Sequence, residues 1–291
     1  MKRALSRRDF LKLLKIASLQ MMVWAMGADL VLNEFDADEL DVKKINLTLP
    51  RLPGAFSGFR LVQISDIHIG GWTTAEKLAQ VIEKVLAQQP DLVAITGDFA
   101  FAAAGGYSTS ADELDAMTDQ LRRLAGACPT AAVMGNHDIR YGRASIQSAL
   151  ELAGLIDLNN KVHALHRGGA SLYLCGVDDV IYKRNRLDLV LDSLPQAVCA
   201  ILLAHEPDYA DTSAASGRFD LQISGHSHGG QVNLPLVGPP VLPRLGRKYP
   251  SGLYRVGEMY QYTNRGIGMT PPFVRFNCPP EMTIFHLHSP A

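Results

Sequence analysis

Short apolar runs alternate with amphipathic segments in the first half of the chain, and this alternation is the strongest constraint on its fold. Apolar runs at 61–64, 92–96 and 131–134 are separated by segments at 74–88 and from 110 onward, whose apolar residues recur every three or four positions. The runs are mostly apolar and do not alternate, which is typical of parallel strands covered on both faces. The pattern predicts α/β architecture.

The second half of the chain continues the apolar runs up to about residue 223 and then changes to a different pattern. Further apolar runs occupy 172–175, 200–203 and 221–223, whereas the chain after Gly230 has short alternating runs rich in glycine and proline, as antiparallel strands do. With 47% apolar and 20% charged residues among 291, the chain is long enough to bury a substantial core. We expect two packed mixed β-sheets flanked by helices.

The N-terminus differs in composition from the rest. A basic stretch is followed by an apolar run at 16–28 that is shorter than the roughly 20 residues a helix needs to cross a bilayer. Small residues at its end favour cleavage as an export signal, and retention as a short anchor is the alternative. The chain is therefore divided into an export signal or anchor at 1–28, a lead-in segment at 29–58 and a single domain at 59–291.

The segment 6–12, which contains the consecutive Arg7 and Arg8, resembles a bacterial twin-arginine signal at every position of its motif. The resemblance implies that the twin-arginine export machinery carries the folded protein across the bacterial cytoplasmic membrane. Its destination is then the periplasm, the cell envelope or a membrane-attached state. Such signals are addresses read by a receptor.

Composition excludes several functions. Lysine and arginine total 28 against 29 aspartate and glutamate, so the net charge of -1 supplies no field that attracts nucleic acid, and no nucleic-acid partner is expected. The four cysteines are widely separated and form no Cys-x-x-Cys pair, which excludes a zinc ribbon and a thioredoxin-type motif. We expect them to be buried thiols.

Potential metal ligands follow the predicted strands. They are Asp66 and His68 after the run at 61–64, Asp98 after 92–96, Asn136 and His137 after 131–134, and His205, His226 and His228 after two later runs. Each is a weak signal alone, but the carboxyl ends of parallel strands meet at one edge of a sheet, where ligands bind. Aspartate, asparagine and histidine suit zinc, manganese or iron. The sequence therefore predicts a metal site there.

The ordered set Asp-x-His, Gly-Asp, Gly-Asn-His-Asp, His and Gly-His-Ser-His, between residues 60 and 231, resembles the calcineurin-like metallophosphoesterase superfamily. Segments 229–232, 246–249 and 264–266 resemble its bacterial exported phosphodiesterase-like branch. The resemblance implies a metallophosphoesterase-like sandwich and two divalent metal ions, which are manganese, zinc or iron. The implied activity is phosphodiester hydrolysis, in which a hydroxide bridging the metals attacks phosphorus.

The resemblance also implies roles for individual residues. It places Asp66, His68 and His228 on one metal, Asn136, His205 and His226 on the other, and Asp98 on both. His137 would then stabilise or protonate the leaving oxygen, and the alternative is that it only orients Asn136 or Asp66. Arg265, within the segment 264–266, is a candidate substrate contact.

Two alternative functions stay open at this stage. One is a pyrophosphatase that acts on a lipid-linked or UDP-diacylglucosamine-type substrate, although export argues against a cytosolic nucleotide-linked sugar. The other is a non-catalytic module that binds metal or a phosphoester, although such a module would be expected to lack one of the predicted residues. Protein dephosphorylation is disfavoured, because the second aspartate and the Arg-Gly of phosphoprotein phosphatases do not follow Asp98.

Two loops bear on substrate choice. The segment 234–252 interleaves five prolines with leucines and valines and carries Arg244, Arg247 and Lys248, which suits a lipid surface or an amphiphilic phosphoester. Its alternative is a rigid loop that packs its leucines on the domain. The segment 99–107 after Asp98 is either an apolar lid or part of the core.

Overall fold

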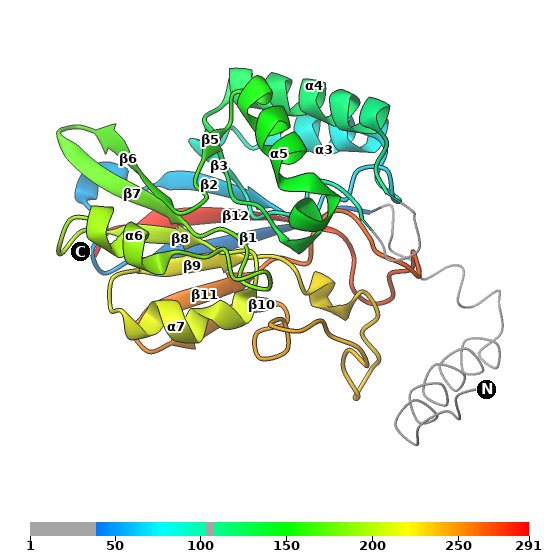
Figure 1. Ribbon diagram of the computed structural model, residues 1–291. Helices are drawn as coiled ribbons and strands as arrows, with labels where there is room; N and C mark the ends of the chain where they lie inside the picture. The colour runs from blue at the N-terminus through cyan, green and yellow to red at the C-terminus, as the bar shows by residue number, and fades with distance from the viewer. Residues whose placement is uncertain (1–38, 103–107, 291) are drawn as a thin grey trace, which may run out of the picture.

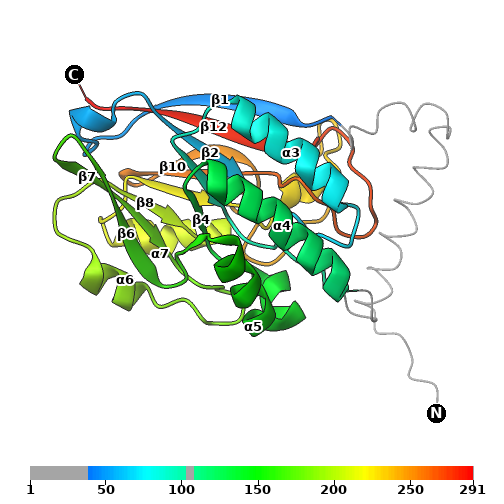
Figure 2. The ribbon, with the colours of Figure 1, turned by 90° about the horizontal axis from the view of Figure 1, so that it is seen from above.

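Two six-stranded β-sheets pack face to face, with helices on both outer faces, as Figures 1 and 2 show. The computed structural model describes residues 39–102 and 108–290. Each sheet contains parallel and antiparallel pairs of strands. The expected α/β fold of two packed mixed sheets flanked by helices is therefore confirmed. The predicted export signal lies outside the described residues.

The first sheet joins both ends of the described chain. Across the sheet its strands are β1 (Asp41–Thr48), β12 (Glu281–His288), β2 (Phe59–Ile64), β3 (Leu92–Ile95), β4 (Thr130–Ala132) and β5 (Ile156–Asp157). Strands β2 to β5 are parallel, whereas β12 is antiparallel to β2 and parallel to β1. Strand β1 pairs with β12 along its whole length, so this part of the lead-in segment is packed on the sheet.

The second sheet is parallel at its centre and antiparallel at its edges. Across the sheet its strands are β10 (Gly252–Val256), β11 (Met259–Thr263), β9 (Leu221–Ser224), β8 (Ala200–Leu203), β7 (Ala170–Gly176) and β6 (Lys161–Arg167). The hairpin of β10 and β11 is antiparallel, as expected after Gly230. Strand β11 itself runs parallel to β9, which the alternating pattern does not predict.

The helices cover the sheets with their apolar faces. The first sheet carries α3 (Ala75–Ala87), α4 (Ala111–Ala127) and α5 (Asn136–Ala153), and the second carries α6 (Leu187–Ser193) and α7 (Ala210–Ala215). Short 3-10 turns are η1 (Gly54–Phe56), η2 (Pro207–Tyr209) and η3 (His228–Gly230). Helix α3 buries residues 78, 82 and 85 on one face, and a capping box of Ser110 and Glu113 starts α4.

Three apolar layers result, one between the sheets and one under each set of helices. In the central layer Leu61, Phe285 and Leu203 are fully buried, and each such side chain contributes about 1.5–3 kcal/mol of transfer free energy. All four cysteines are unpaired and buried, as expected. Among residues 39–102 and 108–290, no helix has the length and apolar character needed to span a bilayer.

Candidate metal centre

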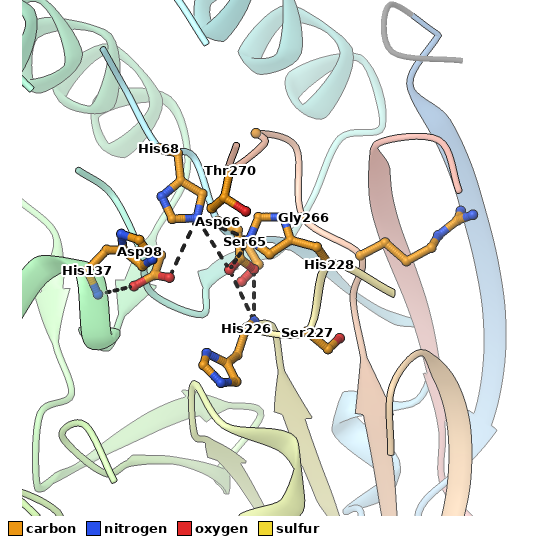
Figure 3. A network of polar contacts seen from close by, with 12 residues as sticks. Ser65, Asp66, His68, Asp98, His137, His226, Ser227, His228, Gly266 and Thr270 are labelled. Carbon is orange, nitrogen blue, oxygen red and sulfur yellow. Dashed lines mark hydrogen bonds and ion pairs between the residues drawn. The ribbon is translucent and has the colours of Figure 1, made fainter. Parts of the chain in front are cut away.

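Loops at the carboxyl ends of strands from both sheets converge on one site. Strands β2 and β3 lead to Asp66 and Asp98, β8 leads to His205 and β9 leads to His226, while Asn136 begins α5 after β4. Figure 3 shows several of these side chains pointing toward one another. The structure buries all seven predicted ligands, which are Asp66, His68, Asp98, Asn136, His205, His226 and His228.

Asp66, His68 and His228 form the first group of potential ligands. Their ligand atoms lie within 4.8 Å of one another. Nε2 of His228 is 3.3 Å from Oδ1 of Asp66 and 3.1 Å from Nε2 of His68, and the two imidazoles are stacked. Three buried nitrogen and oxygen donors at this spacing fit one divalent cation.

Asp98, His205 and His226 form the second group at the same spacing. Nε2 of His205 lies 3.1 Å from Oδ2 of Asp98 yet has no hydrogen-bond partner among the described residues. Oδ1 of Asn136, which lines the same pocket, is likewise buried without a partner there. Buried polar atoms are normally satisfied, so the oxygen of Asn136 points to a bound cation, whereas Nε2 of His205 still has the carboxylate of Asp98 beside it.

Asp98 lies between the two groups. Its Oδ2 is 3.6 Å from Nε2 of His68 in the first group and 3.1 Å from Nε2 of His205 in the second. Its Oδ1 accepts the backbone N–H of His137 at 2.8 Å. The carboxylate therefore has the position that a ligand shared by two cations requires.

The second ring nitrogens of three histidines fix the tautomer of each ring. Nδ1 of His205 donates to the carbonyl of Thr96 at 2.7 Å, because a carbonyl oxygen only accepts. Nε2 of His226 donates to the carbonyl of Arg244 at 2.8 Å, and Nδ1 of His68 lies 3.4 Å from the carbonyl of Ala100. These contacts leave one lone pair of each ring for a metal, as in known metal sites. The residues present therefore fit two divalent cations.

Burial sets the protonation of the site. It lowers the pKa of both His68 and His226 to about 3, so these imidazoles are neutral near pH 7 and can act as ligands. Burial and the neighbouring Asp98 raise the pKa of Asp66 to about 7. Burial also opposes the charge of Asp98, but the adjacent His205 holds the pKa of Asp98 well below its usual range. A cation held by both carboxylates would offset their mutual repulsion.

Backbone strain is concentrated at the predicted ligands. Positive φ angles occur at Asp66 (52°), His68 (47°), Asp98 (57°), His226 (70°) and His228 (52°). Left-handed conformations of non-glycine residues cost roughly 1 kcal/mol or more each and cluster at functional sites. These turns aim alternate side chains into the site.

Glycines that precede predicted ligands let the backbone approach the carboxylates of the site closely. A Cβ at Gly225 would lie 2.3 Å from Oδ2 of Asp66, and one at Gly135 would lie 2.4 Å from Oδ1 of Asp98. Neither of these glycines has a positive φ, whereas Gly97 does. Close approach of backbone to carboxylate, more than a sharp turn, therefore explains Gly135 and Gly225.

Asp138 supports the site in a way that the sequence analysis did not assign. Its buried carboxylate accepts backbone N–H groups from Gly135 and from residues 98–100 at 2.8–3.1 Å. It thereby ties the loop after β3 to the start of α5. The signal available in the sequence was its place three residues after Gly135, where an acidic side chain caps a helix.

Arg275 is a second support, and the sequence analysis missed it. Its fully buried guanidinium donates to the carbonyls of Arg265, Gly266, Gly268 and Cys278. Gly266 and Gly268 in turn pack against Asp66, with a Cβ at Gly266 only 2.7 Å from Cβ of Asp66. Arg275 therefore holds the segment 265–268 against a predicted ligand.

His137 borders the pocket beside Asp98. Its ring is stacked on Phe101 and meets the edge of His68 at a centroid distance of 4.7 Å. Nδ1 accepts the backbone N–H of Ala102 at 3.4 Å, so Nε2 carries the ring proton. Burial lowers the pKa of His137.

The structure bears on two other interpretations of the sequence. Phe99 and Phe101 are fully buried, so this part of the 99–107 segment belongs to the core, while its glycines at 105 and 106 lie outside the described residues. The guanidinium of Arg265 contacts Glu281 at 2.5 Å and Asp41 at 2.6 Å. Arg265 does not line the pocket described below, and its role as a substrate contact stays a prediction.

A pocket of about 330 Å³ opens over the ligands. Its polar wall includes Asp98, Asn136, His137, His226 and His228, and its apolar wall includes Val232, Pro240, Val241, Pro243, Pro271 and Pro272. The volume admits a small phosphoester with one substituent against the apolar wall.

Asp98→Asn is expected to remove a negative charge from between the two cations, and the bound metal should fall from about two ions per chain to fewer than one. Elemental analysis of the purified protein measures this. Asp220→Asn is the matched control, because Asp220 is equally buried but bonds Arg51 away from the site. Two ions retained in Asp98→Asn would contradict the bridging position.

Comparison with known proteins shows the family to which the chain belongs. Residues 59–230 match the family model of the calcineurin-like phosphoesterases. An uncharacterized metallophosphoesterase of Bacillus subtilis, YkuE, is 32% identical over 287 residues, which cover 98% of each chain. Phosphodiesterase YaeI of Escherichia coli is 31% identical over 79% of this chain and 82% of its own. Among solved structures, a dimetal phosphatase from Danio rerio has a TM-score of 0.49 and 13% identity, over 76% of this chain and 91% of its own. Since the family model spans more than half of the sequence and YkuE matches nearly all of it, the chain belongs to the calcineurin-like phosphoesterase family.

Proposed function

We propose that the protein is a phosphodiesterase that requires two divalent metal ions. Its family indicates a hydrolase that acts on phosphoesters, and its members depend on a dinuclear metal centre. The observation that carries the proposal is the carboxylate of Asp98 between two groups of buried ligands, at the wall of an open pocket. The similarity to phosphodiesterase YaeI supports a diester over a monoester.

The ligand assignment follows the two groups. Asp66, His68 and His228 would hold one metal, Asn136, His205 and His226 the other, and Asp98 both. Nitrogen and oxygen donors of this kind suit manganese, zinc or iron. When bound, a metal pair supplies an acidified water and neutralises charge on the phosphoryl oxygens.

The protein's own contribution to the leaving group is His137. Its imidazole is neutral near pH 7 because burial lowers its pKa. Because Nδ1 accepts the N–H of Ala102, the ring proton lies on Nε2, which is therefore the donor of this imidazole. We assign the Nε2–H to donate a hydrogen bond that stabilises the negative charge as it develops on the leaving oxygen, while the neutral ring keeps its proton.

Two alternatives are less favoured. A non-catalytic binding module is disfavoured because every predicted ligand and His137 border one pocket or lie buried beneath it. A pyrophosphatase for a UDP-diacylglucosamine-type substrate is disfavoured by the export that we propose next, since nucleotide-linked sugars are cytosolic.

We also propose that the protein is exported by the twin-arginine route and works in the periplasm, in the cell envelope or attached to the membrane. The support is the motif at 6–12 with Arg7 and Arg8. A protein that carries metal ions gains from being exported folded, because the ions can be loaded before transport.

The function is tested with metal-loaded protein on three soluble substrates, namely an aryl phosphodiester, the matching monoester and a nucleotide-sugar pyrophosphate. The diester should be hydrolysed with a kcat/KM at least about tenfold above the other two. Asp98→Asn serves as the inactive control. Preference for the pyrophosphate would favour the pyrophosphatase, and no hydrolysis of any substrate would favour the binding module.

His137→Ala should keep its metal while kcat falls by about 10²–10³, because a hydrogen-bond donor to the charge that develops on the leaving oxygen is lost. The loss should be smallest on activated aryl esters, whose leaving oxygen needs less stabilisation. Steady-state kinetics on a series of leaving groups, with metal content measured alongside, checks this. His166→Ala on strand β6 is the control, since His166 is exposed and its ring bonds Ser171 of the neighbouring strand β7. An equal loss on good and poor leaving groups would show that His137 only orients its neighbours.

Replacing both Arg7 and Arg8 with lysine should retain folded protein in the cytosol, because the exchange keeps charge but removes the guanidinium groups that the receptor reads. Cell fractionation with metal analysis of the retained protein measures the outcome. Arg3→Lys, outside the motif, is the control and should not change export. Unchanged export of the double variant would refute the twin-arginine route.

A further inference from the structure

Four apolar side chains protrude beside the metal pocket, and we call them the apolar rim. They are Leu236, Val237, Val241 and Phe273, with exposed fractions of 108%, 74%, 69% and 41%. Soluble proteins expose single apolar residues commonly, but a group of them at the mouth of a pocket marks a binding surface.

The tip of the rim is held outward by its own backbone. In the turn that contains Leu236 and Val237, the carbonyl of Leu234 accepts the N–H groups of Gly238 at 2.8 Å and Val237 at 3.2 Å. Leu236 has a positive φ of 67°, which is unfavourable for a leucine. The turn therefore exposes two apolar side chains to solvent and has an unfavourable backbone conformation. Packing on the domain does not explain this exposure.

The rim is continuous with the wall of the metal site. Val241 lines the pocket and is itself part of the rim, and Phe273 follows Pro272, which also lines the pocket. Behind the tip, a Cβ at Gly230 would lie 2.4 Å from Pro239, so the loop is pressed against the 3-10 turn that contains His228. A hydrocarbon chain on the rim would thus adjoin a phosphate in the pocket.

Cations accompany the rim. Arg244 and Arg247 are exposed three and six residues after Val241, whereas the ammonium of Lys248 is paired with Asp211 at 2.7 Å. Two exposed arginines beside an apolar tip complement a surface that is apolar inside and anionic outside. This complementarity favours an anionic lipid surface over a second protein.

The structure shows which leucines of the 234–252 segment are exposed enough to contact a lipid surface. Among the leucines of the 234–252 segment, Leu242 and Leu245 are only partly exposed, and Leu236 is the most exposed. We propose that the rim inserts into an anionic phospholipid surface and that the substrate is a phospholipid-type diester, whose acyl part lies on the rim. The substrate class rests on the phosphodiesterase function proposed above, whereas the docking does not.

The docking is tested on the full chain with a reporter at the tip. Because all four native cysteines are buried, a cysteine introduced by Val237→Cys can be labelled selectively with an environment-sensitive fluorophore. Vesicles of phosphatidylglycerol and phosphatidylcholine should shift the emission to the blue, less so at high salt or with phosphatidylcholine alone. Leu152→Cys is the control, since Leu152 is 66% exposed at the far end of α5, and it should show no shift.

The N-terminal segment is the same in the Val237→Cys and Leu152→Cys proteins. A difference between their emission shifts therefore comes from the labelled position. No shift at position 237, or equal shifts at 237 and 152, would overturn the docking. A shift that appears without vesicles and grows with protein concentration would instead identify a second copy of the chain as the occupant, and would also overturn it.

The substrate class is tested by the double variant Leu236→Ser, Val237→Ser, whose residues do not line the pocket. Hydrolysis of phosphatidylglycerol in vesicles should fall by about tenfold, since apolar area no longer enters the lipid. Hydrolysis of a soluble aryl diester should stay unchanged, and Leu152→Ser should change neither rate. Equal rates on vesicles for the variant and the unaltered protein would overturn the substrate class.

Failure of the unaltered protein to hydrolyse the soluble diester would overturn the phosphodiesterase function. The fluorescence result would still decide the docking.

Discussion

The burial of the Asp98 carboxylate among other ionisable groups is the constraint on which the rest of the structure depends. Two buried carboxylates, Asp66 and Asp98, lie among imidazoles that are kept neutral by burial, with the exception of His205, whose pKa the nearby Asp98 raises. Leaving charges in a low-dielectric interior is strongly unfavourable unless they are paired. The pair of Asp98 with His205 meets that condition in part, and divalent cations held as we propose would meet it for both carboxylates.

Holding donors at this spacing requires a rigid backbone, and the fold supplies it in two ways. The parallel strands fix where each loop begins, and buried side chains then fix the loops themselves. Asp138 accepts N–H groups on one side of the site, and Arg275 donates to carbonyls on the other. These hydrogen bonds to charged groups offset part of the strain of the left-handed residues, because such bonds are stronger than neutral ones.

The sequence predicted what depends on local pattern. The two-sheet fold follows from apolar runs of fixed length, and the gathering of Asp66, Asp98 and His226 follows from their place after such runs. It could not predict what depends on distant partners. Strand β1 has a mostly exposed, polar pattern, and only its pairing with β12 makes it a strand. Arg275 looks like any surface arginine until four carbonyls surround it. Phe101 is core because its partners come from other loops.

The loop that carries the apolar rim is not independent of the metal centre. The carbonyl of Arg244 accepts the Nε2–H of His226, so the loop fixes the tautomer and orientation of a predicted ligand. Changes near Arg244 are therefore expected to disturb metal binding and substrate contact together. Changes at Leu236 and Val237, at the outer end of the loop, leave this hydrogen bond in place. The same loop thus has an inner part around Arg244 that orients His226 and an outer part at Leu236 and Val237 that is exposed to solvent. The residues between Pro239 and Pro243 separate these two parts.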